Sequence, residues 1–279
     1  LSGLVVTTTL AGYLIAPGSI SNSPGVLAST LIGTALCAGA ANAWNQWAEV
    51  QHDARMTRTR LRPLPTKQLS SGHAFGWASV CATSGISLLY FGGPGPLAAG
   101  LAATTIGLYN LVYTPMKRWS VGNTWVGAVV GGIPPLIGYA GALGPAASLQ
   151  SLWPNAAILG LVLYCWQFPH FNALSHNLSQ DYRRAGYCMA AIHRPALNKA
   201  AALVHAAALI PLTVALSPIG TGMVSWGFML DSGALATWIT YLAARFYWRP
   251  GKATARKLFF GSLVYLPAFL TCLVIHSIY

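Results

Sequence analysis

The sequence predicts an all-α polytopic membrane protein, with about nine transmembrane helices around a central cavity that opens to the positively charged side. Two observations predict this class. The 279 residues are 54% hydrophobic and only 7% charged, which leaves too few charges to solvate the surface of a water-soluble domain. The apolar residues also form long continuous runs, as expected of helices that are surrounded by hydrocarbon.

Nine apolar runs are each close to the length of one bilayer crossing, which takes roughly 20 residues. We interpret them as a single transmembrane domain that covers residues 1–279, without a boundary between the runs. The eighth run carries Asp231, an acid that needs a partner or a wet cavity inside a membrane. The runs cover residues 1–16, 25–48, 73–92, 95–115, 123–142, 152–171, 198–217, 224–247 and 258–278.

The basic residues give the orientation of these runs. The chain has 16 lysines and arginines against four acids, and its net charge is +12. All the cations fall after the second, fourth and sixth runs or around the connection between the eighth and ninth. Under the positive-inside rule, this alternation places the N-terminus and the charged connections on the inner side and supports nine crossings. Membrane orientation therefore accounts for the positive net charge. For this reason we predict no nucleic-acid partner.

The first polar cluster follows the second run. Asn42, Asn45, Glu49 and Asp53 are spaced by 3, 4 and 4 residues, so a continuing helix would align them in one stripe. Two acids one turn apart repel each other unless a cation lies between them. Mg²⁺ takes one or two carboxylates plus phosphate oxygens of a substrate. The alternative is a solvated helix end whose acids pair with neighbouring arginines.

A run of arginines comes next. Arg58, Arg60 and Arg62 occupy every second position before Pro63. In an extended segment this spacing points all three side chains the same way, and the guanidinium fork suits a diphosphate. Binding of lipid headgroups is the alternative interpretation. Together with the acids, the run predicts a site for a metal ion and a diphosphate.

The second cluster closes the fourth run. Tyr109, Tyr113 and Lys117 are one helical turn apart, and Arg118 follows directly. Tyrosines of an aromatic belt and a lysine that reaches the membrane surface give the same pattern, so this cluster alone leaves the two interpretations open.

The third cluster follows the sixth run. His170 comes directly after Pro169, which we expect to end the helix, and it could ligate heme iron, act as a base or bind freed backbone. Asp181 lies in the connection after this run, four runs after the connection that carries Glu49 and Asp53. This is a weak internal symmetry. A duplicated four-helix unit would bring the two polar connections together over one cavity.

In this order, the clusters resemble the UbiA-like intramembrane prenyltransferase superfamily, and within it the protoheme IX farnesyltransferase family in its mitochondrial form. The resemblance covers nearly the whole chain. The superfamily's first motif is usually Asn-Asp-x-x-Asp-x-x-x-Asp, and here Gln46 and Glu49 replace two of its aspartates. The superfamily's second motif should carry two aspartates four apart, but this chain has His170, Asn172 and then only Asp181. In this it departs from the quinone-type enzymes and resembles the heme branch. The most specific segments are residues 42–46 with Glu49 and Asp53, residues 56–64, 113–118, 123–128 and 166–172.

The resemblance implies a reaction: transfer of farnesyl from farnesyl diphosphate to a vinyl group of heme B, with hydration, to give heme O for heme A and cytochrome oxidase assembly. It implies Mg²⁺ as cofactor, heme B as substrate, contacts with membrane lipids, and heme A synthase as a candidate partner. It also implies the mitochondrial inner membrane, with the N-terminus and charged loops on the matrix side, or else a bacterial plasma membrane. The oligomeric state is not indicated.

The clusters and the resemblance together assign roles to single residues. The predicted catalytic residues are Asn45, Glu49, Asp53, Tyr113 and Lys117. The predicted diphosphate-binding residues are Arg58, Arg62, Lys117, Arg118 and Tyr113. The predicted heme-binding residues are His170, Asn172, Arg183 and Arg184, and the predicted metal ligands are Glu49, Asp53 and Asp181.

Two other functions fit parts of the sequence. A transporter would also combine many crossings with polar breaks and an internal repeat, but it predicts ionisable residues along the membrane interior, where this chain has Asp231. A prenyltransferase for a quinone-type acceptor fits the first cluster and would carry aspartates in the second motif. The charges crowd one face of the membrane, which favours an enzyme with its charged site at the interface.

Overall fold

The protein is a bundle of long helices, and the computed structural model describes residues 2–277. The predicted first and last runs also include residues 1 and 278, which lie outside the described residues. Within that range the structure contains helices and no β-strand beyond one isolated bridge between Val224 and Ser277. The long helices are α1 (Ser2–Leu14), α2 (Pro24–Ala48), α4 (Ser71–Phe91), α5 (Pro96–Gly107), α7 (Asn123–Gly132), α8 (Pro134–Leu143), α9 (Asn155–Asn177), α12 (Pro195–Leu216), α13 (Trp226–Trp248) and α14 (Lys252–Ile275).

Short elements join the long helices. Five of them are 3₁₀ or π segments or single turns: η1 (Ser19–Ser21), η2 (Leu108–Tyr113), α6 (Thr114–Met116), η3 (Gly144–Ala146) and η4 (Gln150–Leu152). Three more lie in the two long polar connections: α3 (Val50–Asp53), α10 (Ser179–Ala185) and α11 (Ala190–His193).

The helices match the predicted runs one by one, with two of the nine rods built from consecutive pieces, α5–η2–α6 and α7–α8. Six rods are long and apolar enough to cross a membrane: those at residues 24–48, 71–91, 96–116, 123–146, 195–216 and 252–275. Of the others, α1 has 13 residues, while α9 and α13 have 23 each and are less apolar. The all-helical membrane class is therefore confirmed, and the count of nine crossings stays a prediction.

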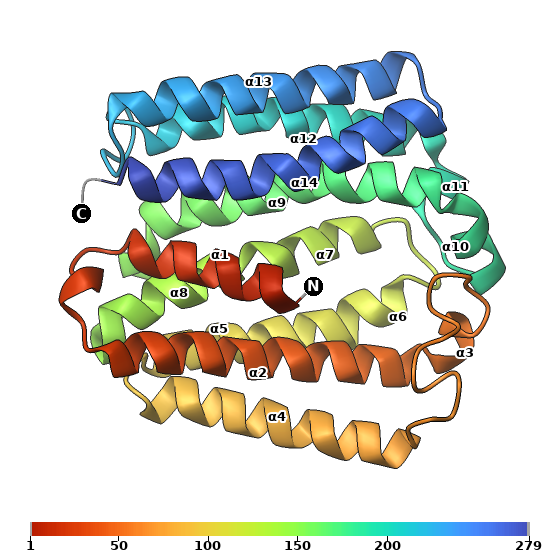
Figure 1. Ribbon diagram of the computed structural model, residues 1–279, viewed down its shortest axis with the longest axis horizontal. Helices are drawn as coiled ribbons and strands as arrows, with labels where there is room; N and C mark the ends of the chain where they lie inside the picture. Colours follow the sequence, from red (N-terminus) through yellow and green to blue (C-terminus); the bar gives the residue numbers. More distant parts are fainter. Residues whose placement is uncertain (1, 278–279) are drawn as a thin grey trace.

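The order of the rods across the bundle is plain in Figure 1. At one edge α2 packs against α4, and at the other edge α13 packs against both α12 and α14. Helix α9 contacts α12 and α14 on one side and α7 on the other, so it lies between the two edges. Helices α1 and α8 pack against each other in the middle of the bundle.

Close contact between α1 and α8 depends on two glycines. A Cβ atom at Gly138 would collide with the carbonyl of Thr9, and one at Gly12 would collide with the carbonyl of Pro135. Small residues of this kind let the backbones of membrane helices approach closely. They draw the short helix α1 onto the bundle beside α2.

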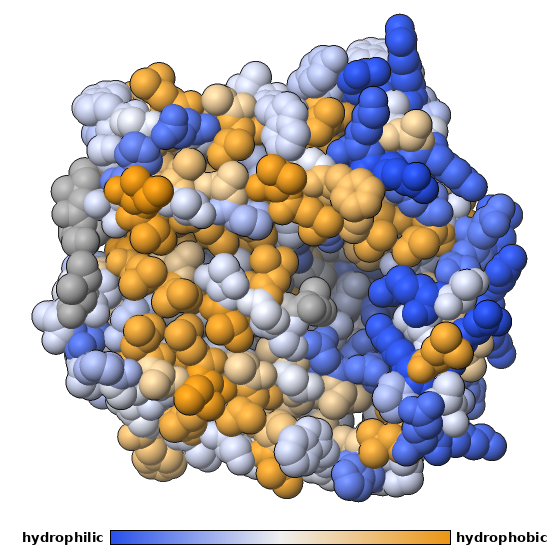
Figure 2. Space-filling model, viewed as in Figure 1, coloured by the Kyte–Doolittle hydropathy of each residue, from blue (hydrophilic) through white to orange (hydrophobic). Residues whose placement is uncertain are grey.

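Hydrophilic side chains gather at the end of the bundle that holds α3, α10 and α11, on the right in Figure 2. The two polar connections meet there, as the sequence predicts. Thr57 donates a hydrogen bond to the carboxylate of Asp181 over 3.0 Å, and His52 contacts the carbonyl of Ala185 over 2.7 Å and stacks on Tyr187. The proposed duplication behind this meeting stays a prediction.

The arginine run is not extended, so that prediction is wrong. Residues 54–69 form a succession of turns, and the amide of Arg60 donates to the carbonyl of Met56 while the amide of Arg62 donates to that of Thr59. In this conformation Arg58 and Arg62 line the cavity and Arg60 does not. The turns close back onto Asp53, since Thr59 donates its hydroxyl to the Asp53 carbonyl over 3.0 Å.

Pro169 does not end its helix, which is a second correction. Helix α9 continues through Pro169 to Asn177. A proline removes one backbone hydrogen bond, but a membrane helix tolerates this when neighbouring helices pack around the break. Pro169 is buried, and α12 and α14 flank α9 on this side.

Candidate active site

A cavity of about 670 Å³ lies between α1, α2, the α5–η2–α6 rod, α7, α8 and α9. Figure 2 shows the surface hollowed beside the hydrophilic end of the bundle. Away from that end the lining is mostly apolar. The apolar lining includes Leu4, Val5, Cys37, Ala41, Ala102, Ile106, Val130, Pro134, Ile137 and Leu163.

Glu49 lies where α2 ends, at the charged end of the cavity. Its amide still donates to the carbonyl of Asn45, so Glu49 directly continues the last turn of the helix. The residue is 4% exposed, and Lys117 donates to both carboxylate oxygens over 2.9 and 3.0 Å. Because Lys117 is 8% exposed, this ion pair is shielded from water and from lipid headgroups.

Asp53 lies one turn further along, at the end of α3. It is 3% exposed, and Arg62 donates to one of its carboxylate oxygens over 2.8 Å. The alternative interpretation of the first cluster, in which the acids pair with neighbouring arginines, therefore holds for Asp53. The helix end is not solvated, however, because both acids are buried and both line the cavity.

The charged side chains at this end of the cavity pair with each other, so their net charge is close to zero. Burying an ion away from water has a large free-energy cost, and this cost is offset only while the ion keeps a partner of opposite charge. A doubly charged anion that enters this end would compete with the carboxylates for Lys117 and Arg62. Freed carboxylates would then be available to a divalent cation.

Tyr109 and Tyr113 reach the cavity through a π-helical segment. In η2 the amide of Thr114 donates to the carbonyl of Tyr109, five residues back, just before Pro115. The hydroxyl of Thr114 donates to the same carbonyl over 2.8 Å. Such insertions rotate the side chains that follow and are frequent at functional sites. Here the two tyrosine rings lie 5.4 Å apart, and both line the cavity.

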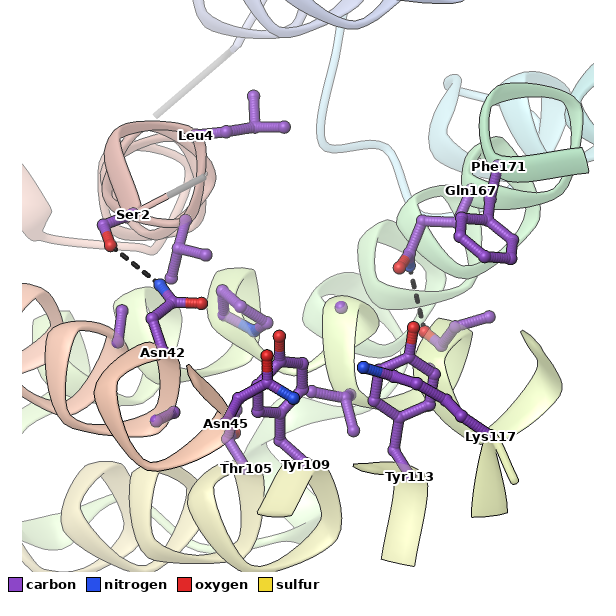
Figure 3. Close-up of a pocket in the computed structure, with 18 of the residues that line it drawn as sticks. Ser2, Leu4, Asn42, Asn45, Thr105, Tyr109, Tyr113, Lys117, Gln167 and Phe171 are labelled. Atoms are coloured by element: carbon purple, nitrogen blue, oxygen red, sulfur yellow. Dashed lines mark hydrogen bonds between the residues drawn. The ribbon is translucent and has the colours of Figure 1, made fainter. Parts of the chain in front are cut away.

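Lys117 and Asn45 connect this segment to α2. The ammonium of Lys117 lies 4.6 Å from the centre of the Tyr113 ring, within the range of a cation–π contact. Asn45 donates to the hydroxyl of Thr114 over 2.9 Å. Figure 3 shows Asn45, Tyr109, Tyr113 and Lys117 along one wall of the cavity.

His170 lines the cavity from α9, whereas Lys117 lines it from the end of α6. Its Nδ1 atom lies 2.9 Å from the hydroxyl of Ser262 on α14. The imidazole ring also stacks on Trp166, with the ring centres 4.9 Å apart. His170 thus lines the cavity from a continuous helix, and its role toward heme stays a prediction.

Four predicted residues are not brought to the cavity. Asn172 faces α12, where it donates to the carbonyl of Asn198 over 3.0 Å. Arg183 and Arg184 are exposed on α10, and Arg184 lies 3.8 Å from Asp181. Asp181 itself is hydrogen-bonded to Thr57 and does not line the cavity. A helix continued past Pro169 turns Asn172 away, because it is only two residues from His170 and cannot share its face.

Of two further arginines predicted to bind the diphosphate, one lines the cavity and the other does not. Arg58 lines the cavity, so it can reach an anion bound there. Arg118 is exposed and donates to the carbonyl of Ala48 over 3.0 Å, which closes the end of α2. Sequence spacing does not separate these two arginines.

Two cavity residues were given no role by the sequence. Gln167 lies one turn before His170 and donates to the carbonyl of Ala128 over 3.0 Å, so its helical spacing could have identified it (Figure 3). Tyr187 follows α10 and is buried next to Glu49, and burial followed by this carboxylate raises the pKa of its phenol. The phenol therefore stays neutral and can donate a hydrogen bond. No spacing rule points to Tyr187, because it reaches the site from a connection.

The donor set limits how a metal could bind. Among residues 2–277 no group of three or more His, Cys, Asp and Glu side chains lies close enough to hold an ion. Glu49 and Asp53 supply two carboxylates one turn apart, which fits Mg²⁺ only if a substrate adds phosphate oxygens. A metal role for Asp181 stays a prediction.

The family comparison agrees with this geometry. The model of the UbiA prenyltransferase family matches residues 5–272. Solved structures share the fold at low identity. An apo UbiA homologue from Aeropyrum pernix K1 has a TM-score of 0.74 at 17% identity, covering 99% of this chain and 98% of that one. A UbiA homologue from Archaeoglobus fulgidus bound to GPP and Mg²⁺ has a TM-score of 0.67 at 11% identity, covering 98% of each chain.

Similar sequences carry a more specific name. The mitochondrial protoheme IX farnesyltransferase of Homo sapiens is 44% identical over 270 residues, covering 97% of this chain and 58% of that protein. The Arabidopsis thaliana protein of the same name is 40% identical over 278 residues, covering 100% of this chain and 63% of that protein. The chain thus spans about three fifths of the length of these relatives.

Proposed function

The chain belongs to the UbiA prenyltransferase family, and we propose that it transfers the farnesyl group of farnesyl diphosphate to a vinyl group of heme B, with addition of water, to give heme O. Relatives at 44% and 40% identity carry the name of this activity, which supports the choice of donor and acceptor. The matched region includes every residue that lines the cavity from α2 to α9.

One observation carries the proposal. Two buried carboxylates, each paired with a buried or half-buried cation, stand at the charged end of a cavity whose remaining lining is apolar. An allylic diphosphate has the same division between a charged head and a hydrocarbon tail. Cys37 and Glu49 are 12 residues apart along α2, roughly 18 Å at the rise of a helix, which gives room for a chain of several isoprene units.

The first step is departure of the diphosphate. The bond between C1 of the farnesyl group and its oxygen breaks, and both electrons leave with the diphosphate. Lys117, Arg58 and Arg62 stabilise the charge on the departing oxygens, and Tyr113 donates a hydrogen bond from the same wall. Mg²⁺ held by Glu49 and Asp53 would supply further neutralisation of this charge.

The second step joins the two substrates. The allylic cation at C1 accepts the π electrons of the heme vinyl group, which forms a carbon–carbon bond and leaves a cation on the vinyl carbon next to the macrocycle. A water molecule adds to that carbon and loses one proton, which yields the hydroxyl group. Apolar walls such as Ile106, Ile137 and Leu163 keep water from the first cation, so that hydrolysis does not compete.

His170 marks the acceptor side of the cavity. It lies on α9, and none of the described residues that line the cavity from α9 is an acid, a lysine or an arginine. We propose that it faces the heme, as an axial ligand or by orienting the macrocycle. Arg183 and Arg184 are exposed on α10, and we propose that they bind the propionates of a heme that extends beyond the cavity.

The cell context belongs to the same proposal. The relatives are named as mitochondrial proteins, and we place this chain in the mitochondrial inner membrane with its basic end toward the matrix. Heme A synthase, which consumes heme O, is the proposed partner.

The test is a reconstitution with defined substrates. Purified protein is incubated with heme B, farnesyl diphosphate and Mg²⁺, and the porphyrin products are analysed by mass. A heme that has gained one farnesyl group and one hydroxyl group is the expected product. Absence of that product, with farnesyl found instead on a quinone-type acceptor offered in parallel, would overturn the assignment of heme B.

A further inference from the structure

We propose that Ser262 on α14 fixes the tautomer of His170, so that the Nε2 atom of this histidine offers its lone pair to the iron of the heme substrate. The inference rests on the proposed function and adds to it a positioning residue and a defined ligand atom. The residues that carry it are 92 positions apart in the chain, on two helices that pack against each other.

The hydroxyl of Ser262 has two neighbours and one proton. Its oxygen lies 2.6 Å from the carbonyl oxygen of Phe259 and 2.9 Å from Nδ1 of His170. A carbonyl oxygen accepts and cannot donate, so the short contact with Phe259 requires the serine proton. If Ser262 donated to the histidine instead, two unprotonated oxygens would face each other at 2.6 Å.

The tautomer of His170 follows from this assignment. With its proton committed to Phe259, the Ser262 oxygen can only accept from the imidazole, so Nδ1 carries the hydrogen. In the neutral ring Nε2 is then unprotonated. No described residue forms a hydrogen bond with Nε2, and the ring lines the cavity. A free imidazole lone pair directed at a substrate cavity is a metal-ligating or base position.

The orientation of the ring is fixed by the same serine. The indole of Trp166 donates to the backbone carbonyl of Ser262 over 2.8 Å and stacks on His170 with an interplanar angle of 21°. Phe259 covers the imidazole from α14, with ring centres 4.9 Å apart. One turn of α14 therefore holds both α9 rings through the carbonyl and the hydroxyl of Ser262.

Ligation of iron explains why such a device would be present. A histidine that ligates a metal almost always donates its other N–H to a fixed acceptor, which sets the tautomer and makes the ligand more basic. A hydroxyl acceptor is weak compared with a carboxylate. A weakly basic ligand suits a heme that must be released after one reaction, rather than kept as a cofactor.

The experiment compares Ser262→Ala with Ser232→Ala. Ser232 is a matched control, because it is also fully buried and donates to a carbonyl of its own helix, but it contacts no histidine. Heme B is titrated into each purified full-length variant, and the iron–histidine stretching band of the ferrous complex is recorded. We expect Ser262→Ala to weaken heme binding roughly 10-fold and to shift the band, while Ser232→Ala leaves both unchanged.

A second variant separates the hydroxyl from packing. Ser262→Thr keeps the oxygen and should retain the wild-type band. Equal heme affinity and equal bands in wild type and Ser262→Ala would overturn the inference, as would a wild-type complex without an iron–histidine band. Neither result touches farnesyl transfer itself, which is followed by product mass in the same samples. A failure of the proposed function would instead show in the wild type as absence of farnesylated heme.

Discussion

The two walls of the cavity differ in charge. The buried charged residues among those described are Glu49, Asp53 and Lys117, and all three belong to the wall built by α2, α3 and α6. The facing wall, built by α9 and backed by α14, presents a histidine and aromatic rings. At one wall, an entering anion and cation could replace the partners of the ion pairs. The other wall presents the imidazole of His170 and flat aromatic surfaces.

Under the proposed function, this difference would place the diphosphate at the charged wall and the heme at the α9 wall. Exchange of ion pairs suits a diphosphate that arrives and leaves with its charge, because each buried carboxylate and cation keeps a partner at every stage. A large macrocycle gains more from stacking and from an uncharged ligand. The comparison can be broken by substitutions that remove charge from the first wall or the ligand atom from the second.

The largest effect is expected for Asp53→Asn. The substitution keeps the shape of the side chain but removes the buried charge that pairs with Arg62 and that, in the proposed site, would bind Mg²⁺, so turnover should fall roughly 10³-fold. Turnover and its dependence on Mg²⁺ are measured on detergent-extracted protein. Asp231→Asn, the same change at a half-exposed acid that pairs with His276, serves as the control. Near-normal turnover of Asp53→Asn, with an unchanged Mg²⁺ requirement, would remove Asp53 from the site.

Lys117→Ala should have the next largest effect. Loss of one charge-assisted contact to the departing diphosphate costs about 2 to 3 kcal/mol of transition-state stabilisation, or roughly 30- to 150-fold in turnover. The assay is run in neutral detergent, where a lysine that binds lipid headgroups would show no loss. Lys257→Ala, an exposed lysine on α14, is the matched control.

Stability must be separated from chemistry at Lys117, because its removal leaves Glu49 buried without a partner. The double variant Glu49→Gln with Lys117→Met removes both charges. We expect it to melt closer to wild type than Lys117→Ala and yet to remain inactive. Recovery of turnover in the double variant would mean that the pair is structural.

His170→Ala tests the neutral wall. Heme B binding should weaken roughly 10- to 100-fold and the Soret band should shift, while affinity for farnesyl diphosphate with Mg²⁺ stays unchanged. The two ligands are titrated separately into the same preparation. Coincident heme spectra and equal heme affinity would mean that the propionates hold the heme, and Arg183 and Arg184 would be examined next.

The smallest effect on catalysis is expected for Asn172→Ala. The side-chain amide of Asn172 donates to the backbone carbonyl of Asn198 on α12 over 3.0 Å, and the side-chain amide of Asn198 donates to the backbone carbonyl of Asn172 over 3.1 Å. Its loss should reduce stability by about 1 to 3 kcal/mol and leave the heme spectrum unchanged. Thermal melting and a Soret titration measure the two quantities. A shifted Soret band with unchanged melting would restore Asn172 to the heme site.

The sequence was informative where one helix carries a whole pattern. The spacing of Asn45, Glu49 and Asp53 predicted a polar stripe, and α2 continued by α3 directs all three into the cavity. The spacing of Tyr109 and Tyr113 likewise predicted neighbouring rings. Such patterns are local, since the rise and turn of a helix decide which residues share a face.

Predictions from the sequence were wrong where packing against other parts of the chain overrides a local backbone preference. Pro169 predicted a helix end, but packing of α12 and α14 around α9 holds the helix through it, which turns Asn172 away from the cavity. The alternating arginines predicted an extended segment, but that segment folds in turns over Asp53. Local preferences of this kind are worth about 1 kcal/mol or a few and are overridden by burial.

By itself, then, the sequence determined the membrane class, the nine rods, the clustering of charge at one end, and the residues that share a face of α2. Tertiary structure alone decided the partners: Lys117 for Glu49, 68 residues away, and Ser262 for His170, 92 residues away. The physical reason is the same in both cases. The periodicity of a helix fixes the direction of its side chains, whereas the side chain that meets them depends on which helices pack side by side, and this is set by the fit of whole surfaces.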